Sequence, residues 1–184
     1  KAVELCCKAG MLLGCKINNL RSWDRKNYFY PDMAKNYQIT QADQPLCLDG
    51  FIEVDVNGTR KRFEIERIHQ EENAAKNIHV SGASLVDYNR AGTALMEIVS
   101  HPCMHSADDA LAYMTAIKQI MQYGGISSCD QEKGQMRSDV NISVRPIGQK
   151  NLGSKVEIKN MNSFAFIYEA IEYEIDRQID VLEN

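Results

Sequence analysis

Three carboxylates and a histidine are the residues whose types and spacing most suggest chemistry. Glu97 interrupts the apolar run Leu95–Val99, and strand alternation places it on one face with both ends of that run. A carboxylate buried there costs several kcal/mol unless a cation or hydrogen-bond donors compensate it. Glu97 is therefore either a core residue paired with an arginine such as Arg90, or a ligand for Mg²⁺, which takes hard oxygen donors.

Two more carboxylates, Glu71 and Glu72, follow His69 at the end of a predicted long strand. On its own this pattern fits a solvated acidic strand tip as well as a site that holds a divalent ion. Both interpretations stay open from the residues alone.

An aromatic and basic block occupies residues 25–32. It combines three aromatics, two cations, an amide and a proline, which is too polar for a core strand and too aromatic for a linker. We expect this block to line a surface that contacts something polar. The alternative interpretation is that Lys26 is an ordinary surface lysine and that Tyr28 and Tyr30 are half-buried aromatics of a sheet.

Polar residues take every second position of two later strands, while apolar residues take the other face. The pattern indicates either a solvated outer face of mixed charge or a floor that anchors phosphate. The polar positions are Arg137, Asp139, Asn141, Ser143 and Arg145 on the first strand and Lys155, Glu157 and Lys159 on the second.

The elements that must position these side chains alternate between hairpins and helices. Asn57-Gly58 is a strong hairpin signal, Ser106 is a predicted helix N-cap, and Gly124-Gly125 ends that helix. The pattern predicts an α+β fold with a mainly antiparallel sheet in a single domain over residues 1–184. Helices are expected over 1–17, 107–123 and 163–184, and strands over 51–56, 59–69, 84–88, 94–99 (a central strand), 136–144 and 154–160.

Composition narrows the function classes. The chain has 184 residues, 44% hydrophobic and 25% charged, which suits one packed domain, and its net charge of −4 argues against bulk phosphate neutralisation. No apolar run approaches a membrane span, and no glycine-rich phosphate loop is present. The six cysteines lack zinc-knuckle spacing, which indicates a reduced compartment and inert core thiols at Cys6 and Cys15.

Five blocks, in order along nearly the whole chain, resemble the B subunit of the bacterial and organellar glutamyl-tRNA(Gln)/aspartyl-tRNA(Asn) amidotransferase. They are Arg25-Lys26-Asn27-Tyr28-Phe29-Tyr30-Pro31-Asp32 with Tyr37-Gln38-Ile39-Thr40-Gln41, then Arg67-Ile68-His69-Gln70-Glu71-Glu72, Ser84-Leu85-Val86-Asp87-Tyr88-Asn89-Arg90-Ala91-Gly92, Leu95-Met96-Glu97-Ile98-Val99-Ser100, and Lys155-Val156-Glu157-Ile158-Lys159-Asn160-Met161-Asn162-Ser163-Phe164.

The resemblance implies an activity and an architecture. The family has a cradle like that of glutamine synthetase and is a carbon–nitrogen ligase with glutamine as amido donor. ATP phosphorylates the side-chain carboxylate of Glu-tRNA(Gln) or Asp-tRNA(Asn), and ammonia then displaces phosphate. The implied cofactors are ATP and Mg²⁺, and the implied partners are the glutaminase A subunit, the small C subunit and mischarged tRNA, in the bacterial cytoplasm or an organellar matrix and without a membrane.

The resemblance also assigns roles to residues. Lys26, Glu72 and Glu97 match catalytic positions, with Lys26 near the mouth of the ammonia route. Glu72 and Glu97 match two Mg²⁺ ligands whose His and Glu partners lie upstream of Lys1, so we expect a fragment with an incomplete metal site, weak Mg²⁺ binding and no activity alone. The residues expected to contact the substrate or the tRNA end are Tyr28, Tyr30, His69, Arg137, Lys155 and Lys159. For Arg137, Lys155 and Lys159 this expectation comes from the alternating polar positions described above.

Some positions depart from the family pattern. The family often has Asp where Asn73 stands, and the sequences at 101–103 and 133–139 also differ. The difference at Asn73 weakens the case for a third carboxylate beside Glu72. The other two differences leave the detailed contacts to the tRNA end open. Two rival classes remain: a stand-alone ligase of the glutamine synthetase type, and a non-catalytic tRNA-binding scaffold.

Overall fold

A computed structural model describes residues 1–161 and 163–184, including the backbone but not the side chain of Asn160. Asn162, part of the last of the five blocks, lies outside the described residues. The chain mixes helices with antiparallel sheets, which confirms the α+β class. The single domain over residues 1–184 stays a prediction. Within the described chain two compact units can be distinguished: residues 1–52 with 64–102, and residues 53–63 with 103–184.

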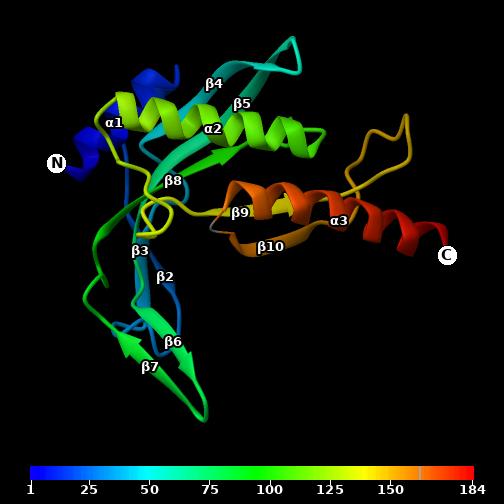
Figure 1. The fold of residues 1–184 in the computed structure, drawn as a ribbon. Coiled ribbons are helices and arrows are strands. Elements are labelled where there is room, and N and C mark those ends of the chain that lie inside the picture. Colours follow the sequence, from blue (N-terminus) through cyan, green and yellow to red (C-terminus); the bar gives the residue numbers. More distant parts are fainter. Residues whose placement is uncertain (162) are drawn as a thin grey trace. The chain divides into compact units, whose positions relative to one another are not determined.

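A four-stranded sheet in the order β1-β4-β5-β8 begins in the first unit. Its strands are β1 (Lys16–Ile17), β4 (Cys47–Val56), β5 (Thr59–Glu72) and β8 (Ala94–Ser100), of which Figure 1 labels β4, β5 and β8. By residue range, β4 and β5 extend into the second unit. The prediction that the strand over 94–99 is central is wrong, because among the described residues β8 pairs with β5 alone and forms an edge of this sheet. Its apolar residues predicted the strand but not the place of the strand in the sheet.

Helix α1 (Ala2–Leu12) packs on this sheet and contacts β1. The helix is shorter than predicted, because Gly14 has a φ of 65° and turns the chain toward β1. Cys6, Leu13, Cys47 and Ile65 are fully buried in the core of this unit. This packing holds the strands that carry the candidate site.

Two further two-stranded ribbons belong to the first unit. β2 (Asp24–Asn27) pairs antiparallel with β3 (Tyr37–Thr40), and β6 (Lys76–Val80) pairs antiparallel with β7 (Ala83–Asp87). The aromatic and basic block thus starts on β2 and continues into the loop toward β3. Phe29 and Tyr30 are mostly exposed, as expected for a contact surface.

The hairpin turn and α2 (Ala107–Tyr123) belong to the second unit. Asn57 and Gly58 both have positive φ, at 51° and 78°, which confirms the predicted turn. Ser106 accepts a hydrogen bond from the Asp109 N–H and caps α2 as predicted. The buried Asp109 carboxylate also accepts hydrogen bonds from the Lys61 ammonium at 2.7 Å and the His105 N–H at 3.0 Å, which ties the hairpin to the start of α2.

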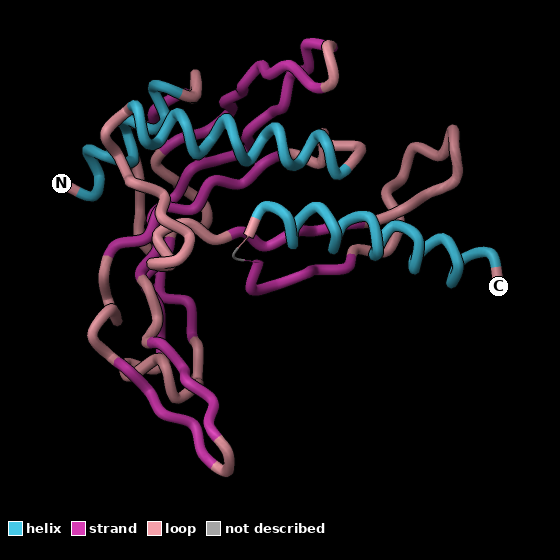
Figure 2. Tube along the Cα trace, viewed as in Figure 1, coloured by secondary structure: helices cyan, strands magenta, loops and turns pink. Residues whose placement is uncertain are grey.

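The rest of the second unit is a hairpin with a helix on one face. β9 (Ser138–Ile142) pairs antiparallel with β10 (Val156–Met161), and α3 (Phe164–Glu183) packs along them (Figure 2). Ile142, Ile167 and Ile171 form the buried centre. The predicted apolar stripe of α3 is covered only in part, since Phe166 and Ile179 are 59% and 39% exposed.

Candidate active site

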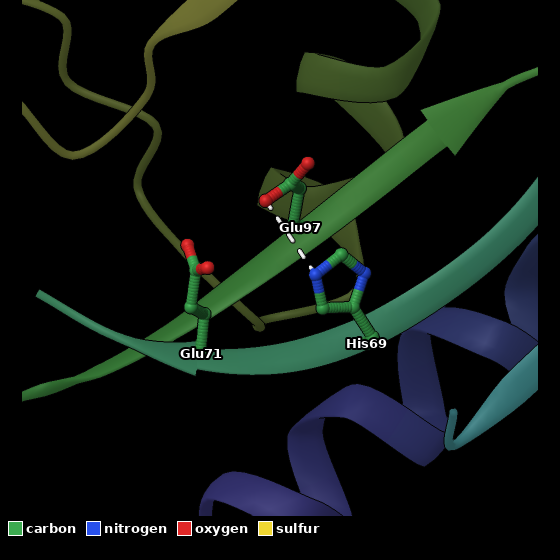
Figure 3. A group of neighbouring side chains, drawn as sticks. All are labelled: His69, Glu71 and Glu97. Carbon is green, nitrogen blue, oxygen red and sulfur yellow. Dashed lines mark ion pairs between the residues drawn. The ribbon is translucent and has the colours of Figure 1, made fainter. Parts of the chain in front are cut away.

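The pairing of β5 with β8 decides which carboxylates meet. His69 lies directly opposite Glu97, and Glu71 lies opposite Leu95. Directly opposed residues share a face, and alternate residues of one strand share a face. His69, Glu71 and Glu97 therefore project from the same side of the two strands (Figure 3), and Glu72 projects from the other.

These three side chains form a compact group. Ligand atoms of His69, Glu71 and Glu97 all lie within 4.8 Å of one another, and His69 Nε2 is 3.5 Å from Glu97 Oε2. The side chains of His69 and Glu71 are 5% and 11% exposed, whereas that of Glu97 is 47% exposed. The group is therefore closed at the base and open to solvent at Glu97, so Glu97 is not a buried core residue paired with Arg90.

The environment of His69 fixes its chemical form. Burial, and then the Arg67 guanidinium, lower the pKa of His69 against the opposing effect of Glu71, so the imidazole is neutral at pH 7. Its buried Nδ1 has no hydrogen-bond partner among the described residues. The proton therefore belongs on Nε2, where it faces the Glu97 carboxylate.

This tautomer bears on what the group could hold. A histidine that ligates a metal ordinarily donates its second ring N–H to an acceptor, and Nδ1 has none among the described residues. Mg²⁺ prefers oxygen ligands and binds proteins through one or two carboxylates plus phosphate and water. The donor set thus fits Mg²⁺ through Glu71 and Glu97, with His69 orienting Glu97.

Lys26 lies at the edge of the group. It projects from β2, is 60% exposed, and places its Nζ 3.7 Å from Glu71 Oε1. The predicted catalytic lysine and one carboxylate of the group are therefore neighbours. The Lys26 ammonium would compete with a bound metal ion for the same Glu71 oxygen.

Glu72 has a different set of partners. Its carboxylate accepts hydrogen bonds from the Lys35 ammonium at 2.5 Å and the Ile39 N–H at 2.8 Å, and its carbonyl accepts one from the Gln38 side chain. Burial raises the pKa of Glu72, but Lys35 and the Ile39 N–H outweigh burial and hold that pKa below its usual value. Glu72 fastens β3 to the end of β5.

The structure therefore does not bring Glu72 and Glu97 together as the resemblance implied. The physical reason is parity: Glu72 lies three residues from His69 and so faces the other side of the strand. The register of β5 and β8 would have identified Glu71 as the partner of Glu97, but a single sequence does not show register. No pattern in the sequence pointed to Lys35.

The tyrosines of the block pack on each other. The Tyr28 and Tyr30 rings stack with centroids 6.1 Å apart, and Tyr28 donates a hydrogen bond to Asp32 at 3.5 Å. Burial and the Asp32 carboxylate raise the pKa of Tyr28. Among the described residues, no hydrogen bond or ion pair joins either tyrosine to His69, Glu71 or Glu97.

The remaining predicted residues lie in the second unit, which is described by itself. Glu157 is paired with Asn141 across β9 and β10, and its neighbours in the alternating pattern face away from α3. Lys155, Lys159 and Arg137 are exposed on or beside this face. Lys159 forms an ion pair of 3.4 Å with Glu157, so the polar floor predicted from alternation is present as a solvent-facing surface.

Comparison with known proteins gives a consistent result over the whole chain. A sequence profile described as "GatB/GatE catalytic domain" matches residues 1–184. The B subunits of aspartyl/glutamyl-tRNA(Asn/Gln) amidotransferases are 56% identical in Opitutus terrae, 53% in Persephonella marina and 51% in a Thermoanaerobacter species. Each match covers 100% of this chain and 39% of the relative, so the chain spans about two fifths of the length of these relatives. None of the described helices is long and apolar enough to cross a membrane.

Proposed function

The chain belongs to the GatB/GatE catalytic domain family, and we propose that it is the part of a tRNA-dependent amidotransferase that houses amide formation. The relatives are named for aspartyl- and glutamyl-tRNA, which supports Glu-tRNA(Gln), Asp-tRNA(Asn) or both as substrates. The observation that carries the proposal is the convergence of Glu71 and Glu97 on one face, with Lys26 beside them.

The reaction requires two steps because a carboxylate is a poor electrophile. In the proposed first step the side-chain carboxylate of the aminoacyl-tRNA attacks the γ-phosphorus of ATP, which gives an acyl phosphate and ADP. In the second step ammonia attacks the acyl carbon and phosphate leaves. The nitrogen then loses a proton, which gives the amide. Ammonia would come from a glutaminase A subunit, with the small C subunit as the third member of the complex.

A divalent ion fits the first step. Mg²⁺ held by Glu71 and Glu97 would neutralise charge on the phosphoryl oxygens. His69 Nε2 lies 3.5 Å from Glu97 Oε2 and would orient that carboxylate. This assignment replaces the Glu72 and Glu97 pair by Glu71 and Glu97, and keeps Glu72 as a positioning residue.

The neighbouring cations and aromatics have complementary proposed roles. Lys26 would orient Glu71. From the family resemblance, it is also proposed to lie near the mouth of the ammonia route. Glu72 fixes β3, whose partner strand β2 carries Lys26. Tyr28 and Tyr30 offer a stacked aromatic surface for the substrate, half-buried at Tyr28 and exposed at Tyr30, and Arg137, Lys155 and Lys159 offer donors for the phosphates of the tRNA end.

The wider assignments follow from the family and remain part of the proposal. They are a cradle of the glutamine synthetase type, and a location in the bacterial cytoplasm or an organellar matrix. A stand-alone ligase and a tRNA scaffold gain no specific observation from the described residues.

The test is a transamidation assay with the full-length protein, its partners, ATP, glutamine and each mischarged tRNA. We expect Glu97→Gln, which keeps the shape but removes the charge, to slow amide formation on the order of 100-fold, the size of a lost contribution to phosphoryl-charge stabilisation. Glu53→Gln is the matched control, because Glu53 pairs with Arg60 on the exposed hairpin. An undiminished rate in Glu97→Gln with an intact complex would reject the proposed site.

A further inference from the structure

Two thiols meet in the core of the first unit. Cys6 on α1 and Cys47 at the start of β4 are 1% and 0% exposed. Cys47 Sγ donates to the Cys6 carbonyl oxygen at 3.7 Å, across 41 residues of chain. The thiols also hydrogen-bond to each other.

A glycine makes this approach possible. Gly10 lies one helical turn after Cys6 on the same face of α1, and a Cβ placed on it would lie 2.5 Å from Cys47 Sγ and 3.2 Å from Cys47 Cβ. Without that side chain, Cys47 lies directly against the helix. The close packing of the two cysteines is thus built into the contact between α1 and β4.

The two thiols differ in reactivity. The hydrogen bond from Cys6 lowers the pKa of Cys47, burial opposes it, and the Arg21 guanidinium lowers it further. The hydrogen bond to Cys47, and then burial, raise the pKa of Cys6. Because the thiolate is the reactive form, Cys47 is the nucleophile of the pair and Cys6 is placed to resolve it.

We propose that Cys6 and Cys47 are a reversible oxidation site, in which a hydroperoxide converts the two thiols to a disulfide that ties α1 to β4. The Cys47 thiolate attacks the peroxide oxygen, which gives a sulfenic acid and releases an alcohol or water. The Cys6 sulfur then attacks the Cys47 sulfur, and water leaves. Both cysteines lose one electron each, the peroxide bond is reduced, and a dithiol restores the starting state by exchange.

Access to the buried sulfurs requires the first turn of α1 to open. Cys7 and Cys15 are half-buried beside the pair and are the competitors for the same reaction. The sequence predicts inert thiols at both Cys6 and Cys15. The proposal departs from that prediction for Cys6 and keeps it for Cys15, because burial raises the pKa of Cys15 to about 12.

The experiment treats the full-length protein with hydrogen peroxide, blocks free thiols with iodoacetamide in denaturant, and maps peptides by tandem mass spectrometry. Within this segment, we expect the alkylated cysteines to fall from six to four, with residues 6 and 47 in one cross-linked product. Dithiothreitol should return all six. Fragment ions within the peptide separate Cys6 from Cys7, so the wild-type protein alone gives an answer.

Variants sharpen the assignment. Cys6→Ser and Cys47→Ser should each abolish the cross-link, while the matched control Cys7→Ser should retain it. Circular dichroism of each variant reports whether the variant is folded. If a variant is unfolded, the peptide map of the wild-type protein alone tests the proposal. Six alkylated cysteines after peroxide, or a cross-link from Cys15 or Cys7 in its place, would overturn the proposal.

Discussion

At the scale of single residues, two adjacent glutamates have separate partners. Glu71 faces Glu97 and the exposed Lys26, whereas Glu72 is held by Lys35 and a backbone N–H of β3. The chemistry available to each carboxylate follows from the side of β5 on which it lies, because the residue type is the same. A stability measurement and a binding measurement should therefore respond to different members of the pair.

Removing Glu72 should cost more stability than removing Glu71. Glu72→Ala leaves the half-buried Ile39 N–H without its acceptor and Lys35 without its counter-ion, a loss of about 1–3 kcal/mol in the free energy of unfolding. Glu71→Ala removes a longer pair with a mostly exposed lysine, which is worth less than about 1 kcal/mol. Urea unfolding of the two variants checks the difference, and equal losses would contradict the anchoring role of Glu72.

His69 should matter to a bound ion only through Glu97. With Mn²⁺ as a probe of the full-length protein, we expect His69→Ala to weaken binding about 10–100-fold, as other residues that orient a ligand do. Glu97→Gln should weaken binding further because it removes a charged ligand. Glu66→Gln, which removes a carboxylate paired with Arg67 on the same strand, is the control. Binding lost more completely in His69→Ala than in Glu97→Gln would make His69 a direct ligand.

At the scale of elements, local signals predicted what local chemistry determines. Asn57-Gly58 predicted the turn, and Ser106 with Gly124 predicted both ends of α2, because caps and turns depend on a few neighbouring residues. The place of β8 at the sheet edge, and the partners of Glu71 and Glu72, could not be predicted, since they depend on pairing between distant strands. Strand alternation likewise placed Glu97 on one face with Leu95 and Val99, but it did not show that Glu97 is exposed to solvent on that face.

The start of α2 should be sensitive to acid through Asp109. Burial raises the pKa of this carboxyl, but hydrogen bonds from Lys61 and the His105 N–H outweigh burial and hold the pKa below its usual value near 3.8. A depressed carboxyl pKa contributes stability that is present above the unfolded-state value and is lost as the pH falls through the folded-state value. Asp109→Asn should thus cost about 2 kcal/mol at pH 7. Thermal unfolding between pH 7 and pH 3 should show that difference shrinking, and a difference independent of pH would contradict the ionic role.

At the scale of the whole molecule, the net charge of −4 means that any contact with RNA must be local. Several of the described cations are paired with acids within their own unit, including Lys26, Lys35, Lys61 and Lys159. The exposed face of β9 and β10 carries the exposed Lys155 and Lys159 beside a polar strand surface. A binding test must therefore separate local phosphate contacts from total charge.

The double variant Lys155→Ala/Lys159→Ala makes that separation. If both lysines contact phosphates at the tRNA end, the affinity of the full-length protein for tRNA falls and the slope of log affinity against log salt decreases by roughly 1.4, since each single-strand phosphate contact contributes about 0.7. Lys8→Ala/Lys16→Ala changes the net charge equally on α1 and β1, and should leave the slope unchanged because long-range interactions are screened within about 10 Å at 0.1 M salt. Filter binding of mischarged tRNA across a salt series measures both slopes. Equal changes in the two double variants would show that the chain meets RNA through total charge, and would remove Lys155 and Lys159 from the proposed binding surface.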